Sequence, residues 1–328
     1  MLLNIEETLE KAFHDAVSKW RGEGLSEEEI SQKVMRTDFS GIFAESIDVF
    51  SEHIYKVSNN VGDTVLQDAK YQKETFLSSM EEKWGTCFDL SELLYHTLLY
   101  LIPQYRECIN RRISHEQQQE KQYTYQCIYH LFCRACQVYF EILCLVRNGF
   151  PEGAFARWRT MYEISCVAEF ISKSGECTAN AYFHDNSNCN LWVKTSPLVQ
   201  NDKDLHKKPY ITFSKIEKHC DFTQNGWNDV YRLSCLTIHA NMEGTFTRNG
   251  IPSDRSVIPL GAVDCGIAFP VTQAAFTLRV IASIYFNIFP SADSIAYSLY
   301  VNKMSDKIYD TYLATETRFQ ELRTTPSN

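Results

Sequence analysis

The sequence predicts an all-α protein, a multi-helix bundle of long antiparallel helices preceded by an N-terminal helical extension. Apolar side chains recur at gaps of three and four residues over most of the chain, which is the period of an amphipathic helix. Helix-start and helix-stop residues separate these stretches, and only 257–259 has the composition of a strand. The length favours about two domains. We expect an N-terminal helical region over residues 1–85 and a helical core domain over 86–328.

The first helices are predicted from local signals. Ser26 and Glu29 form a capping-box pattern that starts a helix, just after a stop signal at Gly24. Residues 40–57 place apolar side chains on one helix face, and 60–83 are more polar, as expected of a helix on the outside. Periodicity and end signals predict further helices over 87–112, 117–148, 152–173, 176–194, 210–220, 226–241, 263–288 and 292–323.

The boundaries between the later helices have physical causes. Asn148-Gly149 is a standard helix C-terminus, and Pro151 suits the first turn of the next helix, where no N–H group is needed. Residues 195–209 and 244–261 combine proline or glycine with mixed polar residues and show no apolar period. We therefore expect both segments to be loops.

Composition restricts the classes of function. With 32 Lys and Arg against 41 Asp and Glu, the formal net charge is −9, so the chain is a poor general binder of nucleic acid, although a local basic site could still bind RNA. No secretory signal is visible, and many of the 12 cysteines, such as Cys127 and Cys166, fall in apolar helical patterns. We expect a cytoplasmic protein with few or no disulfides. No membrane span is expected, because the most apolar stretch, 274–289, contains Arg279.

Arg159 and Glu163 are the first candidate site residues. They stand four residues apart, so they share one face of a helix, and their neighbours are mostly apolar. Burial of charge is costly unless the charges are paired. The pair is therefore either part of a polar site set into an apolar surface or a surface or structural salt bridge.

Arg232 and His239 are the second candidate pair. Seven residues at about 100° each fall about 20° short of two full turns, so both side chains point the same way from a helix, about 10 Å apart along its axis. A phosphodiester could sit between them, held by the guanidinium while the imidazole moves a proton. The alternative is a capping histidine near a helix C-terminus, where a cation is favoured.

Two further patterns could contact a substrate. Lys207 and Lys208 belong to a short basic run that could bind a phosphate backbone, although such a run is more often simply solvated. His184 beside Asp185 could add to a site. We expect these side chains to bind substrate rather than to act on it.

The sequence contains no pattern that predicts a metal or cofactor site. Cys133 and Cys136 form a CxxC pattern, but zinc needs a second ligand pair and none has fitting spacing. The pattern also lies in the middle of a predicted helix, away from the N-terminal position that stabilises thiolates. There is no Gly-rich phosphate loop, nucleophile elbow or HExxH motif. We expect no metal and no cofactor.

Several stretches together resemble a bacterial helical family of unknown function. They are Leu145-Val-Arg-Asn-Gly-Phe-Pro-Glu-Gly-Ala154, Arg159-Thr-Met-Tyr-Glu163 and Tyr231-Arg-Leu-Ser-Cys-Leu-Thr-Ile-His-Ala240, followed by Gly244-Thr-Phe246. That family looks related to the HEPN (higher eukaryotes and prokaryotes nucleotide-binding) superfamily, whose members are helical bundles and often dimers. Many are metal-independent endoribonucleases of toxin–antitoxin, abortive-infection and CRISPR systems.

The resemblance implies a role for each residue of the candidate site. The superfamily motif is an arginine, four to six residues and then a histidine, which Arg232 and His239 match. His239 would activate the ribose 2′-hydroxyl or protonate the leaving oxygen, and Arg232 would stabilise charge on the phosphate. Arg159 would add a second cation, and Glu163 would hold Arg159 or His239 in place. Two positions depart from the pattern, since Leu233 and Cys235 stand where polar residues are usual.

Two hypotheses of function follow from the resemblance. The first is an endoribonuclease toxin or effector of an antiphage, abortive-infection or toxin–antitoxin system, acting on RNA such as tRNA and working as a homodimer. The second is a non-catalytic helical sensor or scaffold that binds a nucleotide or a partner protein in such a system. An antitoxin or another defence protein would be the expected partner, and fold-level analogy cannot choose between the two hypotheses.

Overall fold

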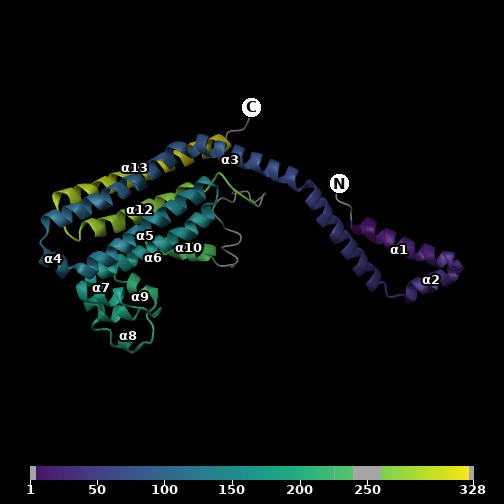
Figure 1. Cartoon of the computed structure of the whole chain (residues 1–328), viewed down its shortest axis with the longest axis horizontal. Coiled ribbons are helices and arrows are strands. Elements are labelled where there is room, and N and C mark those ends of the chain that lie inside the picture. Colours follow the sequence, from purple (N-terminus) through teal and green to yellow (C-terminus); the bar gives the residue numbers. More distant parts are fainter. Residues whose placement is uncertain (1–4, 225, 239–259, 325–328) are drawn as a thin grey trace. The chain divides into compact units, whose positions relative to one another are not determined.

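A computed structural model describes residues 5–224, 226–238 and 260–324. These residues form α-helices and short 3-10 helices with no strand among them, which confirms the predicted all-α class (Figure 1). His239 and the strand-like piece 257–259 lie outside the described residues, as does most of the second expected loop.

The chain divides into two compact units, Met1–Phe76 and Leu77–Asn328. The division expected after residue 85 falls inside the second unit. Helix α3 (Ser40–Arg112) contributes residues to both units, and each unit is described by itself below.

The first unit is a small helical assembly with an aromatic centre. Helix α1 (Ile5–Gly22) is followed by α2 (Glu27–Arg36) and by the first part of α3. The Ser26 hydroxyl accepts from the Glu29 amide, and the Glu29 carboxylate accepts from the Ser26 amide, so the predicted capping box is present. Trp20 is buried beneath Phe39 and Lys33, which fixes the turn between α1 and α2.

Helix α3 is continuous where the sequence predicted three separate stretches. Residues 58–60 (Ser-Asn-Asn) and Gly85 are mild helix breakers, each costing about 0.5–1 kcal/mol relative to Ala. Trp84 and Phe88, on either side of Gly85, are each only 1% exposed. Their burial is worth about 1.5–3 kcal/mol per side chain, which exceeds the cost of the glycine.

The second unit is a bundle in which the C-terminal part of α3 packs antiparallel to two other helices. Cys87 contacts Thr315 and Tyr300 donates to Thr97, so α13 (Ala292–Thr324) runs against α3 (Figure 1). The ring of Tyr95 stacks on Phe140 of α5 (Gln122–Arg147) with centroids 4.6 Å apart.

Helices α6 (Pro151–Ser174) and α12 (Ala268–Phe286) complete the core of this bundle. The turn at 148–150 joins α5 to α6, and Gly149 has a φ of 79°, a left-handed value that suits glycine. Trp158 is fully buried, and its indole N–H donates to Thr277 of α12 at 2.8 Å. The indole N–H of this buried side chain thus joins two helices of the core.

The remaining helices are shorter; α4 lies between α3 and α5 in the chain order, and the others lie between α6 and α12. The expected loop 195–209 contains two of them, which corrects that prediction: the side chains of Ser196 and Asp202 cap their first turns. The segment expected as one helix over 176–194 is interrupted after Phe183. The bounds are α4 (His115–Glu120), α7 (Glu176–Phe183), η1 (Leu191–Thr195), η2 (Pro197–Val199), α8 (Lys203–Lys207), α9 (Phe213–Glu217) and α10 (Trp227–Ile238).

Two of the described helices, α5 and α12, are long and apolar enough to cross a membrane by length and composition alone. Half of the most apolar window of α5 and 61% of that of α12 is buried inside the protein. A core helix of a soluble protein passes the same test of length and composition.

Candidate functional site

The first polar cluster joins α6 to α10 through one tyrosine. Arg159 Nε donates to Glu163 Oε1 at 3.0 Å and to the Tyr231 hydroxyl at 3.4 Å. The Tyr231 hydroxyl donates in turn to Glu163 Oε1 at 2.7 Å. We call these three residues the α6–α10 clamp. Sequence reasoning paired Arg159 with Glu163 as observed, but it did not name Tyr231 as a site residue.

The clamp is half-buried, and partial exclusion of water strengthens the attraction between Arg159 and Glu163. The side chains of Arg159 and Glu163 are 31% and 37% exposed, and the guanidinium lies 5.5 Å from the centre of the Tyr231 ring. Burial raises the pKa of Tyr231, and the hydrogen bond to Glu163 raises it further, while Arg159 lowers it. Tyr231 therefore stays protonated at neutral pH and keeps donating to the carboxylate.

Arg159 retains donors for a further partner. Both of its hydrogen bonds within the described residues use Nε, and neither of its terminal nitrogens has a partner there. A guanidinium fixed at Nε presents its two terminal NH2 groups in a rigid fork that matches phosphate or carboxylate oxygens. The clamp can thus orient Arg159 toward an anion.

A second layer of contacts fixes α10 against α6 and α9. Tyr162 stacks on Tyr231 with centroids 4.6 Å apart and an interplanar angle of 21°. Its hydroxyl lies 2.7 Å from a carboxylate oxygen of Glu217 and 2.9 Å from the amide oxygen of Asn228. The sequence carried a signal for this layer, because Trp227 and Tyr231 stand one helical turn apart and predict an aromatic face on α10.

Arg232 stands next to Tyr231 on α10 but takes no part in the hydrogen bonds of the clamp. It follows Tyr231 directly, so its side chain leaves α10 about 100° further round the helix. It is exposed, and it forms no hydrogen bond or ion pair within the described part of the chain. Cys235, by contrast, lies close enough to Arg159 to affect its pKa. His239 comes directly after Ile238, the last described residue of α10, so the structure does not describe the predicted Arg232–His239 pair.

The other predicted substrate-binding residues lie on separate short elements. Lys207 is at the end of α8, exposed, 3.7 Å from Asp204, and Lys208 caps that helix. His184 caps α7, and its ring contacts that of Tyr123. No hydrogen bond or ion pair between described residues joins any of the three to the clamp.

The cysteine motif sits in the core rather than at a reactive position. Cys133 is half-buried and Cys136 is buried on α5, and burial raises the pKa of both thiols. All 12 cysteines are free, and within the described residues no group of three or more His, Cys, Asp or Glu side chains could hold a metal ion. The clamp itself offers one carboxylate and no described histidine, so it suits an anion better than a cation.

Comparison with known proteins adds one finding. No curated protein and no solved structure matches the chain. Residues 125–225, which run from α5 through the clamp residues of α6 to just before α10, match a family of unknown function (DUF5677). This segment of the chain is therefore similar to an uncharacterised family.

Proposed function

We propose that the protein is a metal-independent endoribonuclease whose active site lies on the α6–α10 surface. The observation that carries the proposal is the guanidinium of Arg159, fixed at Nε by Glu163 and Tyr231 with its terminal nitrogens left for an anion. A phosphodiester is an anion that such a fork holds through two oxygens.

Arg232 supplies the second cation of the proposed site. It is exposed on the helix that packs against α6, and within the described residues no carboxylate neutralises it. Two guanidinium groups on neighbouring helices can share the charge that develops on phosphorus oxygens during cleavage. This local positive charge is also what an acidic chain requires in order to bind RNA.

His239 carries the proton in the proposed reaction. The ribose 2′-hydroxyl loses its proton to a general base and attacks the adjacent phosphorus, and the 5′-oxygen leaves with a proton. No metal or other reactant is consumed, and the products are a 2′,3′-cyclic phosphate and a 5′-hydroxyl. We propose the imidazole as the group that moves this proton, because histidine titrates near neutral pH.

The wider setting of this activity belongs to the same proposal. A HEPN-like homodimer would bring two such surfaces together, and a toxin or effector of a bacterial defence system would be held inactive by a partner protein. The match of residues 125–225 to an uncharacterised family is compatible with these points and argues for none of them.

The test is cleavage of total RNA and of tRNA by the purified full chain in EDTA, at the concentration at which expression arrests growth. We expect cleavage by the wild-type protein and none by His239→Ala, with an unchanged melting temperature. His96→Ala, which replaces an exposed histidine of α3, is the matched control and should cleave normally. No cleavage by wild-type protein would refute the proposal.

A second candidate, a non-catalytic binding module, is favoured by the closure of the clamp. Arg159, Glu163 and Tyr231 are hydrogen-bonded to one another and tie α6 to α10, as a structural lock would. The two candidates differ in Arg232, which takes no part in that lock. If the first candidate is right, Arg232→Ala should abolish cleavage without changing stability. If the cluster only fixes the fold, the wild-type protein should not cleave RNA, and Arg232→Ala should leave stability unchanged.

A further inference from the structure

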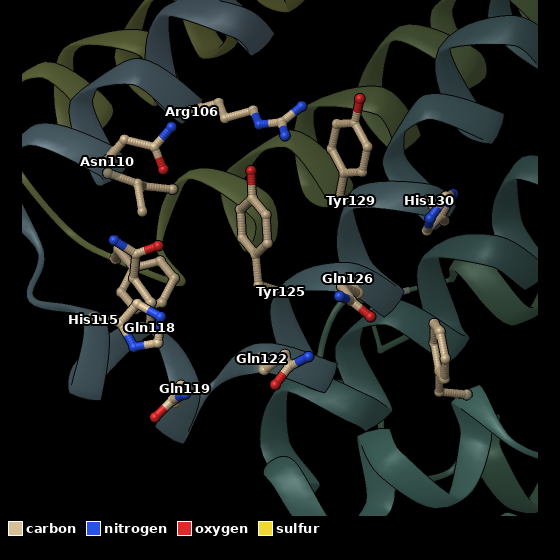
Figure 2. Close-up of a pocket in the computed structure, with 13 residues that line it drawn as sticks. Arg106, Asn110, His115, Gln118, Gln119, Gln122, Tyr125, Gln126, Tyr129 and His130 are labelled. Atoms are coloured by element: carbon tan, nitrogen blue, oxygen red, sulfur yellow. The ribbon is translucent and has the colours of Figure 1, made fainter.

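A cavity of about 690 Å³ opens in the second unit between the C-terminal part of α3, helix α4 and the first turns of α5. None of its 13 lining residues lies on α6 or α10, so it is separate from the α6–α10 clamp. Figure 2 shows the labelled side chains, which come from these three helices and line this space. We call it the amide pocket, because five of its side chains are carboxamides: Asn110, Gln118, Gln119, Gln122 and Gln126.

The charge of the amide pocket is opposite to that of the whole chain. Its lining includes no Asp or Glu, although the chain has a formal net charge of −9. It includes Arg106, whose guanidinium has no ion-pair partner within the described residues, and the imidazoles of His115 and His130. In Figure 2 the guanidinium lies near the hydroxyl ends of Tyr125 and Tyr129. A pocket with one cation and no carboxylate attracts an anion.

Most carboxamides of the pocket form no side-chain hydrogen bond to another described residue. Within the described residues, the side chains of Asn110, Gln119, Gln122 and Gln126 form no hydrogen bond. Gln118 donates its amide N–H to the Ile113 carbonyl at 2.9 Å and keeps its oxygen as an acceptor. Each carboxamide offers an acceptor and two donors in one plane. This is the pattern that complements the edge of a nucleobase.

Aromatic rings supply flat apolar surface beside these amides. The rings of Tyr125 and Tyr129 are 6.1 Å apart and nearly parallel, at 9°, and Phe289 lies 6.1 Å from Tyr125. Both tyrosines are half-buried, so each presents part of its ring to the pocket. Stacking on such a ring is worth about 1–3 kcal/mol per base. A neutral, non-planar ligand would gain neither this stacking nor the charge of Arg106.

The walls of the pocket are held in place before any ligand binds. Glu176 of α7 accepts hydrogen bonds from the amides of Tyr123 and Thr124, at 2.7 and 2.9 Å, and so caps the start of α5 from a distance. Lys121 donates to the carbonyl of Ile288 at 2.9 Å, next to Phe289. A preformed pocket loses little conformational entropy on binding.

We propose that the amide pocket binds a nucleoside phosphate, either as a free nucleotide or as the terminal nucleotide of an RNA strand. The phosphate contacts Arg106, the base stacks on Tyr125 or Tyr129, and the carboxamides of α5 meet its edge. A volume of about 690 Å³ lies within the range of small-molecule sites, about 300–1,000 Å³.

The test is calorimetric titration of the full chain with AMP, CMP, GMP and UMP, beside the four nucleosides and inorganic phosphate. We expect at least one nucleotide to bind about tenfold more tightly than its nucleoside, which corresponds to about 1.4 kcal/mol for the phosphate. Arg106→Gln should remove that difference and leave nucleoside binding unchanged. Arg111→Gln, five residues further along α3 and outside the pocket, is the matched control and should bind as the wild type does.

A second arm separates the two sources of the ligand. A short RNA with a terminal phosphate and the same RNA without it are titrated beside the mononucleotides, and the tighter binder identifies the source. Gln126→Ala should change the ranking of the four bases. Absence of nucleotide binding at about 1 mM, or equal losses in Arg106→Gln and Arg111→Gln, would overturn the proposal. His239→Ala should bind nucleotides normally, so failure of this site and failure of the nuclease are distinguishable.

Discussion

Replacement of Tyr231 by phenylalanine tests the α6–α10 clamp most selectively. The substitution removes only the hydroxyl, which donates to Glu163 at 2.7 Å and accepts from Arg159 at 3.4 Å. It keeps the ring that stacks on Tyr162 and that lies beneath the Arg159 guanidinium. Any loss of stability therefore reports on the hydrogen bonds and not on packing.

The expected magnitude follows from the charge and exposure of the partner. A hydrogen bond to a charged group contributes about 1.5–3 kcal/mol. The Glu163 side chain is 37% exposed, so water replaces part of the lost bond, and we expect a loss of about 1–2 kcal/mol. For a unit of this size that lowers the melting temperature by about 2–4 °C.

The assay is urea and thermal unfolding followed by circular dichroism. Tyr100→Phe, at a side chain that is 65% exposed, is the matched control and should change stability little. In a double-mutant cycle with Glu163→Gln, the double variant should lose less stability than the sum of the losses in the two single variants, because both substitutions break the same bond. A loss no greater than that of the control, or strict additivity in the cycle, would show that the clamp does not join the helices.

Three further predictions concern the described residues. Arg232→Ala should weaken binding of RNA in a filter assay without changing the melting temperature, because this exposed side chain bonds to no described residue; a large loss of stability would contradict its assignment. Glu176→Gln should destabilise the protein by about 1–2 kcal/mol, whereas Glu120→Gln should not, since only Glu176 caps α5; equal effects would refute the cap. Burial raises the pKa of Tyr162 and of Tyr231 above the unfolded value of about 10. The stability that these two hydroxyls contribute is present below about pH 10 and is lost above it. The free energy of unfolding should therefore fall between about pH 9 and 11, and it should fall less in Tyr162→Phe than in the wild-type protein.

Helical period and end signals were sufficient to predict the class and most helix boundaries. The stop at Asn148-Gly149 and the start at Pro151 lie where the structure ends α5 and begins α6. Both signals act locally: glycine permits a left-handed turn, and proline needs no partner for a missing N–H group. Signals of this kind can be recognised without knowledge of the tertiary fold.

Helix α3 and the segment after α7 were harder to predict because tertiary packing decides them. Gly85 resembles a break, but burial of its neighbours outweighs its low helical propensity. Residues 197–199 and 203–207 resemble a loop, and they form single helical turns because Ser196 and Asp202 cap them and Leu205 is buried. Propensity alone cannot supply such context.

The candidate sites were predictable only in part, for a related reason. Arg159 and Glu163 share a helix face, so their spacing alone predicts the ion pair that the structure contains. Tyr231 joins them from 68 residues away in sequence, a distance over which no local pattern extends. The amide pocket was missed because Gln118, Gln122 and Gln126 resemble a solvated helix face, and only the approach of α3 turns that face into a cavity.

The chemical nature of the RNA ends made by the purified protein in EDTA tests the proposed nuclease most directly. Fragments with 2′,3′-cyclic phosphate and 5′-hydroxyl ends are expected from the wild-type protein, and no fragments from His239→Ala. Fragments with 5′-phosphate ends, a requirement for a divalent metal, or unchanged cleavage by His239→Ala would contradict the assignment of Arg159, Arg232 and His239 to a metal-independent site.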